Sequence, residues 1–506
     1  MWSVDPRTGE QREQVGTEST AADVDAAVRG AAAAVPGLAG RDARIALLRA
    51  AADRLEAEAE EIVRTADAET ALGGPRLRGE LGRTTGQLRA FADEVADGGF
   101  LGVIIDHADA TLTPPRPDLR RYRVPLGPVA VYAASNFPLA FSVPGGDTAS
   151  ALAAGCPVVV KAHPGHPATS ALCGAALRRA AADAGLDENT VSVVYGFDAG
   201  VELVQHPLVA AAGFTGSVRG GRALFDLAAA RPVPIPFHGE LGSLNPVVIT
   251  PAAAEERADG IGAGLAGSMT LGTGQFCTKP GLVLAPEGTA GDALLKALGE
   301  RVAEAAEGVL LDGRMRDAFL EGVRARTALP EVDAPVAAGT GTAPRGVTPG
   351  FLTVPAARLA QDGPHELLLE ECFGPLTVVA RYRSPEEVSA VLSRLPGNLT
   401  ATLHLGDQES ADGGEDAVRL LAELTPVAGR VLVNGWPTGV AVAAAQQHGG
   451  PYPATTSTST SVGATAVERW LRPVTYQDTP EALLPPELRA DNPLGLPRRV
   501  DGQREG

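Results

Sequence analysis

The chain has 506 residues and a formal net charge of −18. Nucleic acid and anionic membranes bind basic faces, so we expect neither as a partner. The chain is too long for one compact core, and typical domain sizes predict about three domains. A composition of 44% hydrophobic and 21% charged residues is ordinary for a globular protein.

The cysteines do not form a pattern that predicts a disulfide framework or a zinc site. None of the four shares a Cys-x-x-Cys spacing, and we expect no metal. The N-terminus has neither the basic start nor the apolar core of a secretory signal, and no apolar run of about 18 residues occurs. We therefore expect a cytoplasmic protein. The cysteines are Cys156, Cys173, Cys277 and Cys372.

The first part of the chain predicts helices. From residue 21 to about 95, alanine and leucine recur on one face, and arginine and glutamate on the other. Polar residues within this region, at 69–70 and 80–87, are expected on solvated helix faces. Two β-like stretches follow at 102–106 and 119–124, and the prolines between them are typical of an extended arm.

Residues 127–240 predict a parallel sheet. Short apolar runs alternate with helical stretches, such as 169–184 and 222–230. Apolar strands separated by amphipathic helices are typical of a doubly wound, Rossmann-type sheet, which binds ligands at the carboxyl ends of its strands. The runs are 129–134, 157–161, 191–195, 208–214 and 233–237.

Two glycine patterns compete as a dinucleotide-binding turn. Residues 262–267 formally match Gly-x-Gly-x-x-Gly, but they follow the polar, helix-like stretch 255–259 instead of a strand, so we discount them. Residues 214–222 follow a predicted strand and open a helix. Their N–H groups and the helix dipole suit a pyrophosphate.

A second α/β unit is expected from residue 245 to about 440, and it contains Cys277. Gly272, Gly274, Pro280 and Gly281 frame this cysteine, which predicts a turn. A thiol on a turn can meet the N–H dipoles or the base that a nucleophilic thiolate needs. The alternative is a small buried hydrophobic side chain.

Three short motifs carry a resemblance to a known family. Ser-Asn-Phe-Pro at 135–138, Glu-Leu-Gly at 240–242 and Gly-Gln-Phe-Cys at 274–277 follow one another in this order. They resemble the signatures of the aldehyde dehydrogenase superfamily, and the resemblance covers most of the chain. Residues 134–142 and 275–281 resemble the branch that contains α-ketoglutarate semialdehyde (2,5-dioxopentanoate) dehydrogenases.

The resemblance implies an α/β fold of the aldehyde dehydrogenase type. A doubly wound Rossmann-type cofactor domain would comprise 1–100 and 125–241, and an α/β catalytic domain 242–445. A small β oligomerisation flap would come from 101–124 and 462–506. The family pattern further implies a homodimer or homotetramer.

The implied reaction is the NAD(P)-dependent oxidation of an aldehyde to its carboxylic acid. Cys277 would attack the carbonyl, the Asn136 amide and the Cys277 N–H would hold the oxyanion, and Glu240 would activate water. The substrate suggested by the branch is 2,5-dioxopentanoate, which gives 2-oxoglutarate. Two alternatives are a broad-specificity aliphatic aldehyde dehydrogenase and a non-catalytic oligomeric cofactor-binding protein.

The resemblance also assigns cofactor residues. NAD-preferring relatives carry a glutamate three positions after the matching lysine, and here that position is Pro164. A missing carboxylate removes repulsion of a 2′-phosphate, so we expect NADP, with NAD possible. His163 could add a donor or a partial charge. The other residues implied in cofactor binding are Lys161, Gly216, Ser217, Gly221, Glu371 and Phe373.

The substrate channel is expected to be walled by Phe137, Phe141 and Phe276. A substrate with a carboxylate needs a cation or several N–H donors. Arg120 and Arg121 are candidates because they cluster in the sequence, and the alternative for both is an ordinary surface arginine.

Overall fold

The five apolar runs of the first half form one parallel sheet in the computed structural model, which describes residues 1–505. The strand order is β7-β6-β5-β8-β9, and all neighbours are parallel. The chain winds outward from β5 in both directions, so helices cover both faces. The bounds are β5 (Val129–Tyr132), β6 (Val158–Lys161), β7 (Val191–Val194), β8 (Ala211–Thr215) and β9 (Phe237–Glu240).

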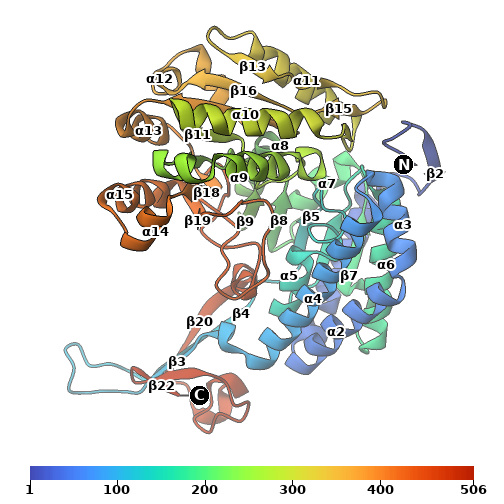
Figure 1. Cartoon of the computed structure of the whole chain (residues 1–506). Coiled ribbons are helices and arrows are strands. Elements are labelled where there is room, and N and C mark those ends of the chain that lie inside the picture. The colour runs from blue at the N-terminus through green and yellow to red at the C-terminus, as the bar shows by residue number, and fades with distance from the viewer. Residues whose placement is uncertain (506) are drawn as a thin grey trace.

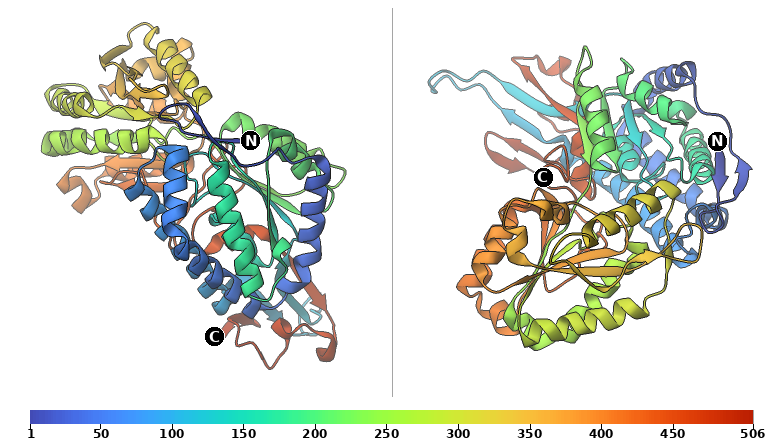
Figure 2. Two further views of the ribbon diagram at one scale, coloured as in Figure 1. Left: turned by 90° about the vertical axis from the view of Figure 1, so that its right-hand side faces the viewer. Right: turned by 90° about the horizontal axis from the view of Figure 1, so that it is seen from above.

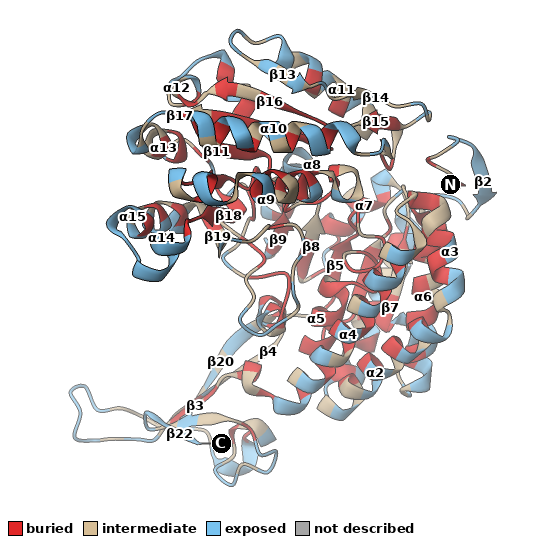
Figure 3. Ribbon diagram, in the orientation of Figure 1, coloured by how far each residue is buried: buried red, intermediate tan, exposed pale blue. Residues whose placement is uncertain are grey.

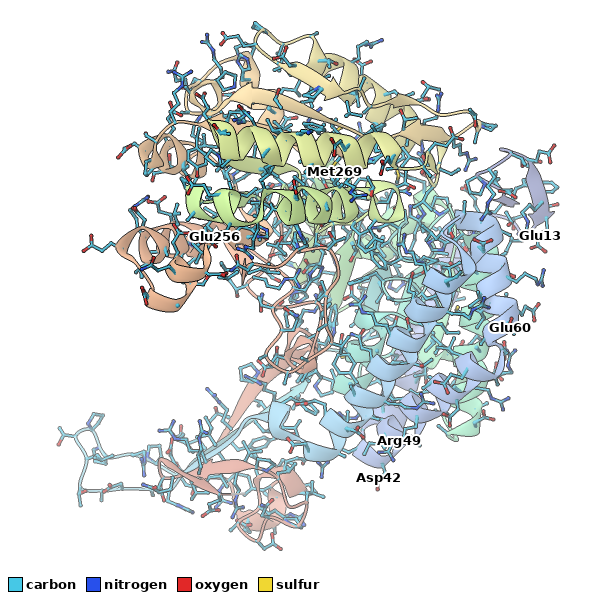
Figure 4. All side chains as sticks on the ribbon, viewed as in Figure 1. Glu13, Asp42, Arg49, Glu60, Glu256 and Met269 are labelled. Carbon is cyan, nitrogen blue, oxygen red and sulfur yellow. The ribbon has the colours of Figure 1, made fainter. Side chains whose placement is uncertain are left out.

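The helices around this sheet bury one apolar face each, as the predicted periodicity requires. Figure 3 shows buried residues on the inner sides of these helices and exposed residues on the outer sides. Charged side chains such as Asp42, Arg49 and Glu60 point outward (Figure 4). The helices are α1 (Ala21–Ala34), α2 (Arg41–Ala57), α3 (Ala59–Thr70), α4 (Gly74–Asp97), α5 (Gly146–Ala154), α6 (Pro167–Asp183), α7 (Phe197–Gln205) and α8 (Val218–Ala229).

The last strand of the sheet begins later than the apolar run that predicted it. The run starts at Val233, but β9 starts at Phe237. Pro234 and Pro236 have no N–H to donate to a neighbouring strand, so the ladder cannot include them as donors. Val233 is accordingly exposed.

Two acidic residues that we expected on solvated helix faces are buried instead. Glu69 accepts hydrogen bonds from the backbone N–H groups of Ala168 and Thr169 and from the Thr169 hydroxyl, at 2.7–2.9 Å. It thereby satisfies the free N–H groups at the start of α6. Glu80 accepts from the N–H groups of Leu139 and Ala140, just after the Ser-Asn-Phe-Pro segment. The sequence prediction was wrong at both positions because these partners are distant in the chain.

The second half of the chain forms a larger sheet in the order β13-β16-β17-β11-β10-β18-β19. All neighbours are parallel except β13, which lies antiparallel at one edge. Its buried strands form a second apolar core. The strands are β10 (Val247–Ile249), β11 (Leu282–Pro286), β13 (Asp333–Val336), β16 (Gly350–Pro355), β17 (Leu376–Tyr382), β18 (Asn398–His404) and β19 (Ala428–Val433).

The helices of this lobe include the discounted glycine pattern. Gly262 and Gly264 lie inside a long helix, and a Cβ at Gly262 would lie 2.9 Å from the Leu294 carbonyl oxygen of the next helix. Gly262 therefore allows α9 and α10 to pack closely, and Gly264 makes room for the Trp436 ring. The pattern lies within a helix and not in a turn between a strand and a helix. The helices are α9 (Pro251–Thr270), α10 (Thr289–Glu304), α11 (Gly313–Thr327), α12 (Ala356–Leu359), α13 (Pro385–Leu392), α14 (Asp407–Asp412) and α15 (Glu415–Leu424).

A third sheet projects from the first lobe as a flap, at the end away from the second lobe (Figures 1 and 2). Its strand order is β20-β4-β3-β21-β22, and β4 and β20 pair antiparallel over their full length. Two smaller sheets, β1-β2 and β12-β15-β14, complete the fold. The strands are β1 (Trp2–Val4), β2 (Gln11–Gln14), β3 (Val103–Asp106), β4 (Leu119–Pro125), β12 (Gly308–Val309), β14 (Gly339–Thr340), β15 (Gly346–Thr348), β20 (Leu471–Gln477), β21 (Arg498–Val500) and β22 (Gln503–Glu505).

The segment before β20 belongs to the first core and not to the flap, contrary to the boundary at residue 462. The short helix η7 (Ala464–Trp470) packs against α5. Trp470 is fully buried there, and its indole N–H donates to the Ser150 hydroxyl at 2.8 Å. A large aromatic side chain with a satisfied N–H fixes this segment to the lobe. Among residues 1–505, no helix combines the length and the apolar character needed to cross a membrane.

We predict that Glu69→Ala lowers the free energy of unfolding by about 2–4 kcal/mol, because it leaves buried N–H donors at the start of α6 without acceptors. Chemical denaturation measures the change. Glu61→Ala, at an exposed position of the same helix α3, is the matched control and should change the free energy by less than about 0.5 kcal/mol. Equal effects of the two variants would contradict the capping role of Glu69.

Candidate active site

Two cavities meet at Cys277. The larger, of about 400 Å³, extends between the carboxyl ends of β8 and β9 and the second lobe. The smaller, of about 240 Å³, lies against α4. Four residues line both cavities, so a molecule in either one can reach the thiol. They are Phe137, Phe141, Cys277 and His448.

The backbone before Cys277 makes a tight turn. The short helix η4 (Leu271–Gly274) contains positive φ angles at Gly272, Thr273 and Gly274. A Cβ at Gly274 would overlap the backbone of Gly374 and Pro375, so only glycine fits there. Cys277 itself lies in a turn after this helix, as its flanking glycines predict.

Two buried side chains hold the turn after the thiol in place. The Asn245 amide donates to the carbonyl oxygens of Cys277 and Lys279, at 2.8 and 2.9 Å. The Lys279 ammonium donates to the carbonyl oxygens of Cys372 and Leu376. The cysteine turn is therefore tied both to the start of β10 and to the loop before β17.

The free thiol is surrounded by groups that keep it protonated. Burial raises the pKa of Cys277 to about 12, and the nearby carboxylates of Glu240 and Glu371 add to this shift. The sulfur lies 3.7 Å from Nε2 of His448. Burial, together with the positive charge of Arg430 and other arginines, lowers the pKa of His448 to about 3. His448 is therefore a neutral imidazole beside the thiol at neutral pH.

Asn136 and Glu240 both lie beside this thiol in the larger cavity. Asn136 is buried, and its amide nitrogen donates one hydrogen to the Gln275 carbonyl at 2.8 Å, which leaves its second hydrogen available. Glu240 ends β9 and is also buried, and its Oε2 has no hydrogen-bond partner in the described part of the chain. Burial raises the pKa of Glu240 well above its usual range, and the nearby Arg469 opposes this shift. The larger cavity thus holds an amide donor and a carboxyl group with a free oxygen.

The turn from β8 into α8 forms one wall of the larger cavity. Ser217 caps α8 and accepts from the Gly220 N–H at 3.2 Å. Glycine is required at two positions, because a Cβ at Gly216 would overlap Phe214 and one at Gly221 would overlap Leu241. The first N–H groups of a helix have no intrahelical acceptors, so this wall can receive a pyrophosphate.

Lys161 ends β6 at the carboxyl edge of the same sheet, and it lines neither cavity. Its ammonium lies 5.9 Å from the centre of the Phe197 ring. Burial lowers its pKa, the negative charge of Glu18 opposes this shift, and the positive charge of Arg314 adds to it. A nicotinamide dinucleotide fits these features: a lysine at a strand end, the free N–H groups at the start of α8, and the glycines of the turn before it.

Of the two roles expected for His163, a hydrogen-bond donor or a partial positive charge, the structure is compatible with the donor. Its Nδ1 accepts from the Gly165 N–H at 3.1 Å, so Nε2 carries the ring hydrogen. Burial and nearby positive groups, including Lys161 and Arg314, lower its pKa well below the usual range. His163 is therefore neutral and can act as a donor. Arg314, on α11 in the second lobe, also lines the larger cavity, and sequence reasoning did not identify it.

Glu371 and Phe373, from the loop before β17, also line the larger cavity. Burial raises the pKa of Glu371 to about 7, and the positive charge of Lys279 opposes this shift. A Cβ at Gly242 would lie only 2.8 Å from the Glu371 carboxylate, so the absence of a side chain at Gly242 leaves room for Glu371. Glu371 and Phe373 can thus contact the end of a cofactor bound along the cavity.

The three predicted aromatic residues lie together beside the thiol. Phe137 packs edge-on against Phe141 and Phe276, with ring centres 5.4 and 5.2 Å apart. All three line the smaller cavity. They form an apolar wall that leads to Cys277.

Arg120 and Arg121 lie elsewhere, and neither lines a cavity at the thiol. Both belong to β4 of the flap. Arg120 is buried between Asp118 and Glu481, with nitrogen–oxygen distances of 3.0 and 2.8 Å. Its charge is already neutralised, and Arg121 faces solvent. The prediction that they meet the substrate was wrong. The two arginines cluster in the sequence, but their strand β4 lies in the flap, away from the cavities at Cys277.

Two other arginines line the smaller cavity, Arg76 and Arg83. The sequence analysis expected Arg83 on a solvated helix face and gave no role to Arg76 or His448. A usable signal existed, because Arg76, Glu80, Arg83 and Gln87 recur at helical spacing on one face of α4. Polar residues that recur on a helix face packed against the protein interior indicate a buried polar site.

Comparison with known proteins identifies the family. The sequence model of the aldehyde dehydrogenase family matches residues 1–472 of this chain. The chain belongs to this family. It is 49% identical over 475 residues to α-ketoglutaric semialdehyde dehydrogenase 2 of Azospirillum brasilense, which covers 92% of this chain and 88% of that one.

A second relative and a solved structure agree with this assignment. The chain is 43% identical to α-ketoglutaric semialdehyde dehydrogenase of Acinetobacter baylyi, over 86% of this chain and 82% of that one. An NADP-dependent enzyme of E. coli has the same fold, with a TM-score of 0.78 at 22% identity over 94% of each chain. The protein is thus an NAD(P)-dependent aldehyde dehydrogenase, which oxidises an aldehyde substrate.

Proposed function

We propose that this aldehyde dehydrogenase oxidises 2,5-dioxopentanoate to 2-oxoglutarate. The observation that carries the proposal is the 49% identity, over 92% of this chain, to a relative named for α-ketoglutaric semialdehyde. The smaller cavity beside Cys277, with its apolar wall and two arginines, supports an aldehyde that ends in a carboxylate. A broad-specificity aliphatic aldehyde dehydrogenase is the alternative, since the same thiol would serve it.

In this proposal, Cys277 forms the covalent bond to the substrate. Its thiol must first lose a proton, and the thiolate then attacks the aldehyde carbon to give a thiohemiacetal. The negative oxygen formed in this step accepts from the free hydrogen of the Asn136 amide and from the Cys277 N–H. The two buried side chains that fix the cysteine turn, Asn245 and Lys279, keep this N–H in position.

Glu240 acts after the oxidation step, when the substrate is a thioester of Cys277. A water molecule attacks the thioester carbon, Glu240 takes a proton from that water, and the acid leaves as the thiol is restored. Glu240 must be deprotonated to do this. Burial raises its pKa, so the fraction of active carboxylate increases as the pH rises.

We propose that NADP is the preferred cofactor and that NAD is possible. When bound, the nicotinamide accepts a hydride from the substrate carbon. Lys161, His163 and the β8–α8 turn with Gly216, Ser217 and Gly221 would hold the adenosine and pyrophosphate end. Glu371 and Phe373 would hold the nicotinamide end. Pro164 offers no carboxylate to a 2′-phosphate, and the charges of Lys161 and Arg314 outnumber the nearby Glu18.

We also propose that the chain assembles as a homodimer or homotetramer through the flap. The flap is a sheet that projects from the first lobe (Figure 1), and much of its strand β20 is exposed in the single chain. Light scattering of the purified chain measures the number of subunits.

A substrate panel tests the proposed function. With NADP, we expect kcat/KM for 2,5-dioxopentanoate to exceed that for pentanal by about tenfold or more, because a buried site for a carboxylate rejects an analogue without one. Glutarate semialdehyde, which keeps the carboxylate, should fall between them. Cys277→Ala should abolish turnover of all three. A wild-type preference for pentanal would favour the broad-specificity alternative.

We predict that Glu240→Gln slows hydrolysis of the thioester more than the oxidation step, because an amide cannot take the proton of water. Stopped-flow absorbance should show one stoichiometric burst of reduced cofactor, followed by a phase about 100-fold slower than the wild-type turnover. In the wild type, the rate of hydrolysis should rise with pH through the raised pKa of Glu240, and the variant should lack this dependence. If the rates of the burst and of the slow phase fell by the same factor, Glu240 would instead activate the thiol of Cys277 before the oxidation step.

We predict that Pro164→Glu reduces kcat/KM for NADP by about tenfold or more, because a carboxylate near a 2′-phosphate repels it. Pro164→Gln adds a side chain of similar size without the charge and serves as the control. The measurement compares both cofactors with one aldehyde. A wild-type preference for NAD beyond tenfold would contradict this role of Pro164.

A further inference from the structure

The smaller cavity beside Cys277 carries two cations on one face of a single helix. Arg76 and Arg83 lie seven residues apart on α4, which places them two turns apart on the same side. Both line this cavity together with Cys277 and the phenylalanine wall. The cavity therefore has a thiol and two guanidinium groups within its walls.

The two guanidinium groups have free donors in a buried setting. Arg76 uses Nη2 to donate to the Asn136 carbonyl at 2.8 Å, while its buried Nη1 has no partner. The buried Nε and Nη2 of Arg83 also have no hydrogen-bond partner in the described residues. Buried N–H groups without acceptors are costly, so this arrangement favours an acceptor supplied by a ligand.

Among residues 1–505, the carboxylate that acts on both guanidinium groups is Glu80, which lies between them on α4. Its Oε1 accepts from the N–H groups of Leu139 and Ala140, and its buried Oε2 has no hydrogen-bond partner among these residues. Neither arginine forms an ion pair among residues 1–505, so the cluster is one negative charge short.

Aromatic rings orient both cations. The guanidinium carbon of Arg76 lies 5.2 and 4.8 Å from the ring centres of Phe137 and Phe276. That of Arg83 lies 5.1 Å from the Phe141 ring centre. Contact with a ring covers the flat face of a guanidinium and leaves its N–H edge for hydrogen bonds to an oxyanion. The same rings that wall the channel thus position its cations.

We propose that Arg76 and Arg83 bind the distal carboxylate of an ω-oxo acid whose aldehyde carbon lies at Cys277. The proposal rests on the proposed function and names the residues that select its substrate. A carboxylate there would accept charge-assisted hydrogen bonds from both arginines and supply the missing negative charge. An uncharged aldehyde would leave both cations buried and unpaired, so the site would discriminate against it.

Substitution of Arg83 tests the proposal more directly than substitution of Arg76. Arg76 also holds the Asn136 carbonyl, so its loss would disturb the amide that faces the thiol. The Nε and Nη2 of Arg83 form no hydrogen bond within residues 1–505. Arg83→Met keeps an unbranched side chain as far as the position of Nε, and removes the guanidinium group with its charge, its donors and its contact with the Phe141 ring.

The experiment compares kcat/KM for 2,5-dioxopentanoate and for pentanal in the wild type, Arg83→Met, Arg83→Lys and Arg78→Met. Arg78 is exposed on the same helix and serves as the control. We expect Arg83→Met to lower the ratio of the two values at least about 30-fold, mainly through KM for the oxo acid. Arg83→Lys should restore part of the ratio, and Arg78→Met should leave it within about twofold.

The outcomes separate this inference from the proposed function. If the wild type prefers 2,5-dioxopentanoate and Arg83→Met keeps that preference, the assignment of Arg83 is wrong and the proposed function stands. Equal loss for both substrates would show a structural role for Arg83 and would also overturn the inference. If the wild type itself does not prefer the oxo acid, the proposed function fails before any variant is considered.

Discussion

The position of the reactive thiol depends on one buried amide. Asn245 is almost fully buried and has a positive φ of 54°, and its nitrogen bridges the carbonyl oxygens of Cys277 and Lys279. Its oxygen accepts from Ser243 and Thr400, so both ends of the amide are satisfied. A satisfied buried polar network is rigid, because every alternative leaves a donor or acceptor unpaired. This network fixes the cysteine turn against the start of β10.

The same low-polarity surroundings explain the charge states in the site. Burial raises the pKa of Cys277, Glu240 and Glu371, and it lowers that of His448. The thiol and the imidazole are thus neutral at neutral pH, and the raised pKa of both carboxyl groups favours their neutral forms. In such a setting each added charge acts strongly on the others.

The architecture places this chemistry between two sheets. Lys161, Ser217 and Glu240 lie at or just after the carboxyl ends of β6, β8 and β9. Cys277 and Glu371 precede β11 and β17, which are neighbours in the second sheet. The carboxyl edge of one parallel sheet thus faces the amino edge of the other. Helix α4 then closes the space beside the thiol, and its arginines give the substrate side a charge that the overall composition lacks.

The sequence by itself determined the local features of this protein. Hydrophobic periodicity determined the strands of the first sheet, and the glycines determined the turn that carries Cys277. A strand–turn–helix context separated the turn at Gly216, which joins β8 to α8, from the glycines of α9. Short motifs were enough for the family, because their chemistry depends on residues close together in the chain. What only the tertiary structure decided was which charges are buried and with whom. Glu69 and Glu80 looked like solvated helix residues, and Arg120 looked like a cation available to a substrate. Helix α6, the loop after Asn136 and Glu481 decided otherwise, since the partner of a charged side chain comes from a distant segment that packing alone brings near.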